Sequence, residues 1–444
     1  MNIDAAIAFV EGHIDYGTWV ARSGRTGNVE LSLDRMRRFI ELLGNPQVGL
    51  PIIHVTGTNG KGSTSRMITR LLMGEGLRVG TYSSPHLARY NERFRLNDID
   101  IDDTTLAALL TAAADAEEHL GERLMPFEVL TGAAYTWFAQ QRVDVAVIEV
   151  GVLGRFDATN VGDGSVAVVT NIGFDHTDGE GDWQQRIADE KAGIVKPGSH
   201  LILGSIDSRL EHVFETQGAA SIWRLGREIN TVADRPAATG RNVAVSTPLQ
   251  TLDSIELSLH GAHQSTNCAL AVATASAFLE RPLEPSSARS ALADVRMPAR
   301  LETVMLHPQV VIDGAHNPDA ARALGAAIRD GMPCAGQRTL VIGLLAGRDP
   351  SAMLAAIDAS NFANVIACTP PTARARPAAE LAAAAAALGC AVRVIDNIGD
   401  ALQAAIDTAD SLDQIVVTGS IYLVADAREW LLARAHDSQG REPS

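Results

Sequence analysis

The sequence predicts an α/β protein with two domains, each built on a mostly parallel sheet. Short β-branched apolar runs alternate with helical patterns along most of the chain. Continuous apolar strands separated by helices are typical of a doubly wound sheet that is covered on both faces. The length of 444 residues also exceeds what one hydrophobic core usually organises, and length alone leaves a third domain open.

The first sheet is expected within residues 1–297. It opens at the apolar run PIIHVT (51–56), which a helical pattern over 61–75 follows. Three further strands are predicted at LRVGTYSS (77–84), at VDVAVIEVG (143–151) after a helical 127–140, and at SVAVVTNIG (165–173). Residues 242–260 instead alternate apolar and polar side chains, which indicates a small extension of two or three antiparallel strands. We therefore expect a P-loop-type doubly wound sheet with an antiparallel addition.

A second α/β series follows and is expected to form a Rossmann-like domain over residues 298–444. It opens at VVIDGAHNPDAARALGAAI (310–328) and passes through further apolar runs to IVVTGS (415–420). The boundary is placed near VRMPARLE (295–302), where Pro298 interrupts a helical pattern and a strand pattern follows.

Charge and composition exclude several classes of protein. The net charge of -16, with no basic stripe to offset it, argues against a protein that coats nucleic acid. Four scattered cysteines without a C-x-x-C pair suggest neither a zinc knuckle nor a disulfide framework. The start of the chain lacks signal-peptide features, and the apolar stretch LAAAAAALGCAV (381–392) is too short for a membrane span. A cytoplasmic protein without a membrane partner is expected.

The stretch HVTGTNGKGSTSRMI (54–68) carries the first chemical signal. A strand, a glycine-rich turn, Lys61 and a helix start form an anion site, because backbone amides and the helix N-terminus point at one place. The strict phosphate-loop pattern fails, since Val55 replaces its first glycine and Gly62 separates Lys61 from Ser63. A tight turn that caps a buried strand is the alternative.

The segment GTNGKGS (57–63) resembles the nucleotide loop of the Mur ligase superfamily, in its dihydrofolate synthase and folylpolyglutamate synthase branch. Other segments resemble that branch in the same order over about residues 30–425: SSPHLARYNERFRL (83–96), FEVLT (127–131), GRFDATN (154–160), TNIGFDHT (170–177), EKAGIVKPG (190–198), MPARLE (297–302), VIDGAHNP (311–318) and VTGSIYLV (417–424). The resemblance implies a monomeric, ATP-dependent ligase that joins L-glutamate to dihydropteroate and to reduced folates.

Three alternatives remain open beside that bifunctional activity. The chain could join an amino acid to a different carboxylic acid, as other Mur-type ligases do. It could act as a folylpolyglutamate synthase only. It could also be a nucleotide-binding homologue that has lost the ligase chemistry.

The resemblance implies that ATP contacts residues of the glycine-rich loop, with Lys61 as a catalytic residue: Thr58, Asn59, Gly60, Lys61, Gly62 and Ser63. It also implies nucleotide contacts from Asn267, Arg300, Asp313 and His316. Gln264 lies three residues before Asn267 and so on the same helix face, and is a further candidate. The alternatives are a polar helix start at 264–267 and a helix cap by Asn317 or Asp319.

Two magnesium ions are implied as well. Glu149 closes an apolar strand, and ligands gather at the carboxyl ends of parallel strands, although it could instead cap the strand in solvent. The resemblance implies that Ser63 meets the magnesium of the nucleotide, and that Ser84, Glu149, His176 and Lys191 hold the second ion. It further implies that Lys191 is carbamylated and that His176 and Lys191 are catalytic. Without it, Lys191 would be read as a solvated lysine on a helix.

The resemblance places the pterin substrate at Phe127, Gly154, Arg155, Asp157 and Ala158. An aromatic ring can stack on a pterin and a carboxylate can accept from its amino edge, although Phe127 would by default be a core residue. The chain departs from the pattern of the family at three positions: Leu153, Ala299 and Gly347.

Overall fold

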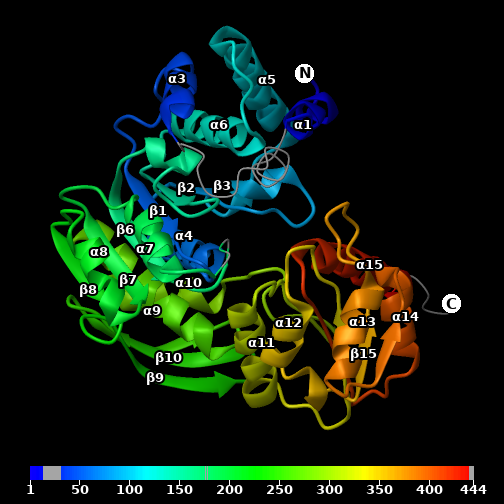
Figure 1. The fold of residues 1–444 in the computed structure, drawn as a ribbon. Helices are drawn as coiled ribbons and strands as arrows, with labels where there is room; N and C mark the ends of the chain where they lie inside the picture. The colour runs from blue at the N-terminus through cyan, green and yellow to red at the C-terminus, as the bar shows by residue number, and fades with distance from the viewer. Residues whose placement is uncertain (14–31, 176, 178, 440–444) are drawn as a thin grey trace. The chain divides into compact units, whose positions relative to one another are not determined.

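The computed structural model describes residues 1–13, 32–175, 177 and 179–439, and the chain forms two compact units (Figure 1). The first unit comprises Met1–Ala233, Val243–Ile255 and Thr266–Val295. The second comprises Asp234–Asn242, Glu256–Ser265 and Arg296–Ser444.

The first unit is built on an eight-stranded sheet in the order β4-β3-β2-β5-β1-β6-β7-β8. Its strands are β1 (Ile52–Thr56), β2 (Val79–Tyr82), β3 (Phe94–Leu96), β4 (Ile99–Asp100), β5 (Val145–Glu149), β6 (Gly164–Asn171), β7 (His200–Ser205) and β8 (Ser221–Arg224). β3 pairs antiparallel with β2 and with β4, while the pairs from β2 to β8 are parallel. Every residue of β1, β2 and β5 is buried, which explains their continuous apolar runs.

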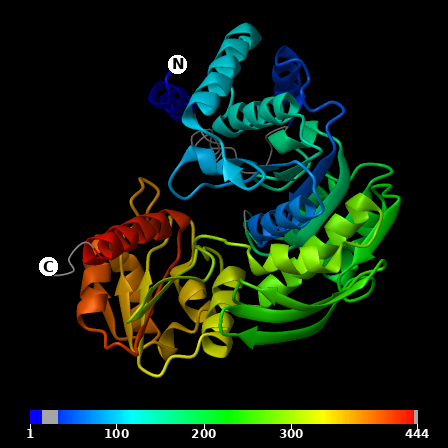
Figure 2. The ribbon, with the colours of Figure 1, turned by 180° about the vertical axis from the view of Figure 1, so that it is seen from behind.

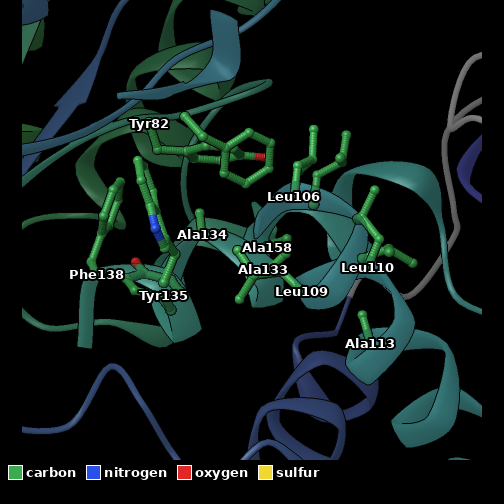
Figure 3. Packing of buried hydrophobic residues seen from close by; sticks show 14 of the residues in the cluster. Tyr82, Leu106, Leu109, Leu110, Ala113, Ala133, Ala134, Tyr135, Phe138 and Ala158 are labelled. Atoms are coloured by element: carbon green, nitrogen blue, oxygen red, sulfur yellow. The ribbon is translucent and has the colours of Figure 1, made fainter. Parts of the chain in front are cut away.

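Helices cover both faces of this sheet (Figures 1 and 2). One face carries α1 (Ile3–Glu11), α3 (Asp34–Leu42), α5 (Asp103–Leu120) and α6 (Pro126–Gln141) around a shared apolar core. Figure 3 shows the centre of that core, where Leu106 and Leu110 of α5 lie near Ala133 of α6. On the other face, α4 (Lys61–Gly74) packs against β1, β2 and β5 and against α10 (Pro285–Ala293). Around β6 and β7, α7 (Trp183–Ala192) and α8 (Glu211–Glu215) close a second cluster.

The antiparallel extension predicted over 242–260 is confirmed for two strands, and a third strand that was not predicted precedes them in a sheet of the order β11-β10-β9. It consists of β9 (Asn230–Ala237), β10 (Gly240–Ser246) and β11 (Thr251–Leu257), and α9 (Ala262–Leu279) follows. Gly240 has φ 144°, and a Cβ there would lie 2.0 Å from the carbonyl oxygen of Leu257. Only glycine fits so close an approach between neighbouring strands.

The second unit holds a six-stranded sheet in the order β12-β13-β17-β14-β15-β16. Its strands are β12 (Glu302–Leu306), β13 (Gln309–Ile312), β14 (Arg338–Ile342), β15 (Asn364–Ala367), β16 (Val392–Val394) and β17 (Gln414–Thr418). All pairs are parallel except β12 with β13. A core cluster joins this sheet to α11 (Pro318–Gly331), α12 (Pro350–Ala356) and α13 (Ala378–Ala387), and α14 (Ile398–Asp407) and α15 (Ile421–Gln439) complete the unit. The predicted α/β class is confirmed for both sheets.

One detail of the predicted boundary is wrong. Pro298 does not interrupt a helix, because α10 has already ended at Ala293. A turn over Met297–Arg300 then leads to β12. Among the described residues, no helix is both long enough and apolar enough to cross a membrane.

Candidate active site

The turn that joins β1 to α4 is tight because glycines occupy its strained positions. Gly60 has φ 83°, which is left-handed backbone that favours glycine. A Cβ at Gly57 would lie only 1.8 Å from Oγ1 of Thr170, at the end of β6. The loop therefore lies directly against the carboxyl end of the neighbouring strand.

A network of hydrogen bonds fixes this loop to β6. The amide of Asn59 donates to Oδ1 of Asn171 at 3.0 Å, and Nδ2 of Asn171 returns a bond of 2.9 Å to the Asn59 carbonyl oxygen. Thr170 Oγ1 donates to the same carbonyl oxygen at 2.6 Å, and the Gly173 amide donates to Thr58 Oγ1 at 2.9 Å. The prediction from sequence missed Thr170 and Asn171, although two polar residues that end a buried strand were a usable signal.

Lys61 begins α4 and bends back over the loop. Its Nζ donates to the carbonyl oxygen of Gly57 at 3.0 Å. Ser63, in the first turn of the same helix, is buried with 3% of its surface exposed. A full positive charge thus stands at the N-terminus of a 14-residue helix, where backbone amides already favour an anion.

Asn267 of α9 also lies at this loop. A Cβ added at Gly60 would lie 2.6 Å from Asn267 Oδ1, and Asn267 is itself buried. The predicted nucleotide residue Asn267 and the glycine-rich loop therefore meet in the first unit. Gln264, one turn earlier in the same helix, is buried as well.

Three residues predicted to bind the second magnesium are described. Glu149 ends β5, is 4% exposed, and its Oε2 accepts the Ser84 amide at 3.3 Å. Lys191 of α7 is 3% exposed rather than solvated. Burial, and then the positive charge of Lys61, lowers the pKa of the Lys191 amine to about 7, against opposing effects of Asp175 and other acids. His176 lies outside the described residues.

No cluster of three or more His, Cys, Asp or Glu side chains with metal-binding geometry occurs in the described parts of the chain. The proposed ligand set has one described side chain of these types, Glu149, together with serine hydroxyls, a modified lysine and His176, which lies outside the described residues. Its members are therefore not the kind that such a cluster would reveal, and the prediction stays a prediction.

The loop that holds Gly154 and Arg155 packs on the end of α7. A Cβ at Gly154 would lie 2.6 Å from the Glu190 carbonyl oxygen and 3.0 Å from Cα of Lys191. The Arg155 amide donates to that same carbonyl oxygen at 2.7 Å. Leu153, which departs from the family pattern, has φ 62°. Gly154 thus lies directly beside Lys191, and Arg155 lies against its chain neighbour Glu190.

Asp157 has a structural role in the same loop. Its two oxygens accept from the Val152 amide at 2.9 Å, from the Thr159 amide at 3.0 Å and from Thr159 Oγ1 at 2.5 Å, which caps the short helix η2 (Ala158–Val161). Burial raises the pKa of the Asp157 carboxyl group.

The remaining substrate candidates are apolar. Ala158 belongs to the core around α6, where Figure 3 labels it beside Ala133 and Ala134. The Phe127 ring centroid lies 5.7 Å from that of Tyr82, and a Cβ at Gly151 would lie 2.6 Å from the Phe127 ring. Phe127 therefore packs at the edge of the core, which was the alternative to a substrate contact. Its contact with substrate stays a prediction.

In the second unit, Arg300, Asp313 and His316 gather around one turn. Asp313 accepts from the amides of Leu301 at 2.9 Å and Ala315 at 2.8 Å, while Nδ1 of His316 lies 2.9 Å from the Gly314 carbonyl oxygen. A Cβ at Gly314 would lie 2.4 Å from Nη1 of Arg300.

The backbone around that turn includes one strained alanine and one helix cap. Ala299, where the family pattern has glycine, has φ 57°, a left-handed conformation that alanine adopts at a cost of about 1 kcal/mol. The predicted helix cap is confirmed, since Asn317 Oδ1 accepts the Ala320 amide at 2.9 Å.

Comparison with known proteins identifies the family. The model described as Mur ligase middle domain matches residues 55–275, and the one described as Mur ligase, glutamate ligase domain, matches residues 299–421. The chain belongs to the Mur ligase family. It is therefore an ATP-dependent ligase, as the sequence predicted.

Two curated relatives match nine-tenths or more of this Mur ligase. A folylpolyglutamate synthase of Lacticaseibacillus casei is 35% identical over 97% of this chain and 99% of the relative. A dihydrofolate synthase/folylpolyglutamate synthase of Mycobacterium tuberculosis is 34% identical over 90% of each chain.

Solved structures agree with these relatives. The M. tuberculosis folylpolyglutamate synthase complexed with ADP and AMPPCP superposes with a TM-score of 0.87 at 31% identity over the full length of both chains. E. coli FolC in complex with DHPP and ADP gives a TM-score of 0.84 at 30% identity, over 98% of this chain and 99% of the other. Structures of this fold thus bind nucleotide and small-molecule ligands.

Proposed function

We propose that this Mur ligase joins L-glutamate to dihydropteroate and to reduced folates in an ATP-dependent reaction. The observation that carries the proposal is the glycine-rich loop before α4, which hydrogen bonds hold against β6. Lys61 bends back over this loop, and Asn267 lies against its Gly60. The near-full-length likeness to a relative named dihydrofolate synthase/folylpolyglutamate synthase supports the choice of substrates. The likeness to E. coli FolC with DHPP and ADP supports it as well.

We further assign residues 1–297 to an ATP-binding middle domain with a pterin pocket and residues 298–444 to a glutamate ligase domain. The two family matches, which end at 275 and begin at 299, are consistent with that division. The protein is proposed to act in the cytoplasm as a monomer.

The residues present fit the two magnesium ions that the family implies. Glu149 is a nearly buried carboxylate at the end of a parallel strand, and Lys191 is buried with a lowered pKa, so that its amine is available unprotonated to react with carbon dioxide. Ser63 would hold the ion of the nucleotide, and the second would be held by Ser84, Glu149, His176 and carbamylated Lys191. When bound, magnesium offsets negative charge on the transferring phosphoryl group.

The reaction then follows from the chemistry of its reactants. A carboxylate oxygen of the acid attacks the γ-phosphorus of ATP, the bond to the β-phosphate oxygen breaks, and ADP leaves. The amine of L-glutamate attacks the resulting acyl phosphate, an amide bond forms, and phosphate leaves as the amine loses its proton. Lys61 and the loop amides orient the γ-phosphate and stabilise its charge as it transfers. Arg300, Asp313 and His316 are proposed to contact the nucleotide from the second unit.

The pterin substrate is proposed to contact Phe127, Gly154, Arg155, Asp157 and Ala158. Gly154 and Arg155 have the strongest support, because their loop lies directly against Lys191. A carboxylate held there would be near the residues proposed for phosphoryl transfer.

The test is magnesium-dependent ADP release by the purified protein with ATP and L-glutamate, with dihydropteroate in one reaction and tetrahydrofolate in another. We expect turnover with both. Turnover with tetrahydrofolate alone would restrict the enzyme to polyglutamate extension. If ATP binds and neither acid supports turnover, the proposed substrates are wrong.

A further inference from the structure

A cavity of about 660 Å³ lies in the first unit beside the Gly154–Arg155 loop. Three basic side chains from separate segments line it: Arg37 of α3, Arg155, and Lys196 after α7. Phe156 and Asp34 are also in its wall. Among the described residues that line the cavity, three are cations and one is an acid, so this part of its wall is locally positive in a chain whose net charge is -16.

Two of these cations, Arg37 and Lys196, keep capacity for a ligand, whereas Nη2 of Arg155 donates to the Asp189 carbonyl oxygen at 2.9 Å. Nη1 of Arg37 donates to Asp34 Oδ1 at 3.1 Å, and the Arg37 side chain is 63% exposed. Nζ of Lys196 lies 3.3 Å from Oδ1 of Asp163, whose own side chain is 88% exposed. The Lys196 side chain is 24% exposed. Ion pairs with an exposed partner are weak, and an anion that contacts both Arg37 and Lys196 can compete with the acids.

The cavity is adjacent to the proposed reacting centre. Gly193 lines it and follows Lys191 by two positions, and Arg155 lines it while its amide is bonded to Glu190. Gly154 therefore lies against Lys191, and the next residue, Arg155, lines the cavity.

The two proposed acid substrates differ in the charge near their reacting carboxylate. Dihydropteroate has no glutamate, whereas a folate carries one α-carboxylate for each glutamyl residue. Because glutamate is added through the γ-carboxylate at the end of the chain, the α-carboxylates follow directly behind the reacting group. Basic side chains next to the reacting centre would recognise them.

We propose that this cavity binds the α-carboxylates of the γ-linked glutamate chain, with Arg37 and Lys196 as residues that favour folyl substrates over dihydropteroate. The proposal rests on the proposed function. It assigns Arg37 and Lys196 a role that neither the loop motif nor the family pattern gives them.

The test compares Arg37→Gln, Lys196→Gln and the double variant with the parent enzyme. KM for tetrahydrofolate diglutamate is expected to rise about three- to tenfold in each single variant, with kcat changed less than twofold. KM for dihydropteroate is expected to change less than twofold. Arg38→Gln is the matched control, because Arg38 is next to Arg37 on the same helix but pairs with Glu122 and does not line the cavity.

A binding measurement keeps this inference separate from the ligase proposal. A γ-linked triglutamate peptide, titrated by calorimetry, should bind the Arg37→Gln and Lys196→Gln variants more weakly than it binds the parent protein. This difference does not depend on which acid the enzyme turns over. If the parent enzyme turns over neither acid but the peptide still binds the variants more weakly than the parent, the ligase proposal fails and the cavity assignment stands. Equal KM changes for both acids, or peptide affinity unchanged by both substitutions, would overturn the assignment.

Discussion

The main-chain groups of Asn59 are bonded to the side chain of Asn171 in both directions. The Asn59 amide donates to Oδ1 at 3.0 Å, and Nδ2 of Asn171 donates to the Asn59 carbonyl oxygen at 2.9 Å. One amide side chain at the end of β6 thus fixes both main-chain polar groups of Asn59, the residue before Gly60. The conformation of the glycine-rich loop depends on this residue of a neighbouring strand.

Asn171→Asp should weaken ATP binding without unfolding the protein. The substitution keeps the size of the side chain but replaces the Nδ2 donor by an oxygen that faces the Asn59 carbonyl oxygen. Losing a buried hydrogen bond and gaining a repulsion is expected to raise KM for ATP about tenfold. Steady-state kinetics with varied ATP, with circular dichroism as the check on folding, measures this. An unchanged KM would mean that the pair does not order the loop for ATP.

Lys61→Ala should leave a folded protein with almost no ligase activity. The ammonium of Lys61 stands at the N-terminus of α4, where it would stabilise charge on the transferring phosphoryl group. Its removal is expected to lower kcat on the order of 100-fold or more. ADP release under saturating substrates gives kcat, and near-normal turnover would remove the loop from the mechanism.

Gly60→Ala should impair ATP use more than the same substitution at a comparable turn. Gly60 has φ 83° and a new Cβ would lie 2.6 Å from Asn267 Oδ1, whereas Gly76 has φ 87° with nothing within 4 Å. Both variants pay about 1 kcal/mol of left-handed strain, but only Gly60→Ala displaces a side chain at the loop. We expect a KM for ATP raised severalfold in Gly60→Ala and unchanged in Gly76→Ala. The same KM for ATP in the two variants would mean that the position of Asn267 does not affect ATP binding.

The sheets were predictable because buried parallel strands leave continuous apolar runs, as in β1, β5 and β17. β9 was missed, because its sequence NTVADRPA is polar and contains proline, and its residues are at least partly exposed. Such a strand has no core to mark it, and only its pairing with β10 defines it.

The candidate site was predictable only where one segment carries its whole signal. The loop of Lys61 does so, through its glycines and the helix start. Asn171 acts on a loop 112 positions away, and a hydrogen bond over that separation leaves no periodic trace in the sequence. The structural role of Asp157 could have been predicted, because an aspartate two residues before a threonine is a local capping pattern. It was not predicted because Asp157 was interpreted as a substrate contact.

Carbamylation of Lys191 is expected to leave a labelled carbon on this residue. Protein incubated with magnesium and carbon-13 bicarbonate should show a carbamate resonance in its NMR spectrum, and Lys191→Arg should lack it. Because Lys191 is 3% exposed, the environment would shield the carbamate from solvent. A parent spectrum without the resonance under conditions of full activity would contradict carbamylation.

His54 should make the stability of the first unit depend on pH. Burial in β1, and then the nearby charge of Lys196, lowers the pKa of His54 from 6.5 to about 3. The unfolded chain therefore binds a proton near pH 6.5 that the folded chain does not bind until about pH 3. Stability contributed by neutral His54 is complete above pH 6.5 and is lost as the pH falls toward 3.

The loss between pH 7.5 and 5.5 should amount to about 1.4 kcal/mol, and His54→Gln should abolish it. The variant will start from a lower stability, because Nε2 of His54 bonds to Thr159 Oγ1 at 2.9 Å inside the core. The decisive quantity is therefore the difference between parent and variant in unfolding free energy by urea, which should shrink as the pH falls. His119→Gln, at an exposed position of α5, is the matched control. A parent-to-variant difference that stays constant between these pH values would mean that His54 takes up its proton in the folded state as readily as in the unfolded chain.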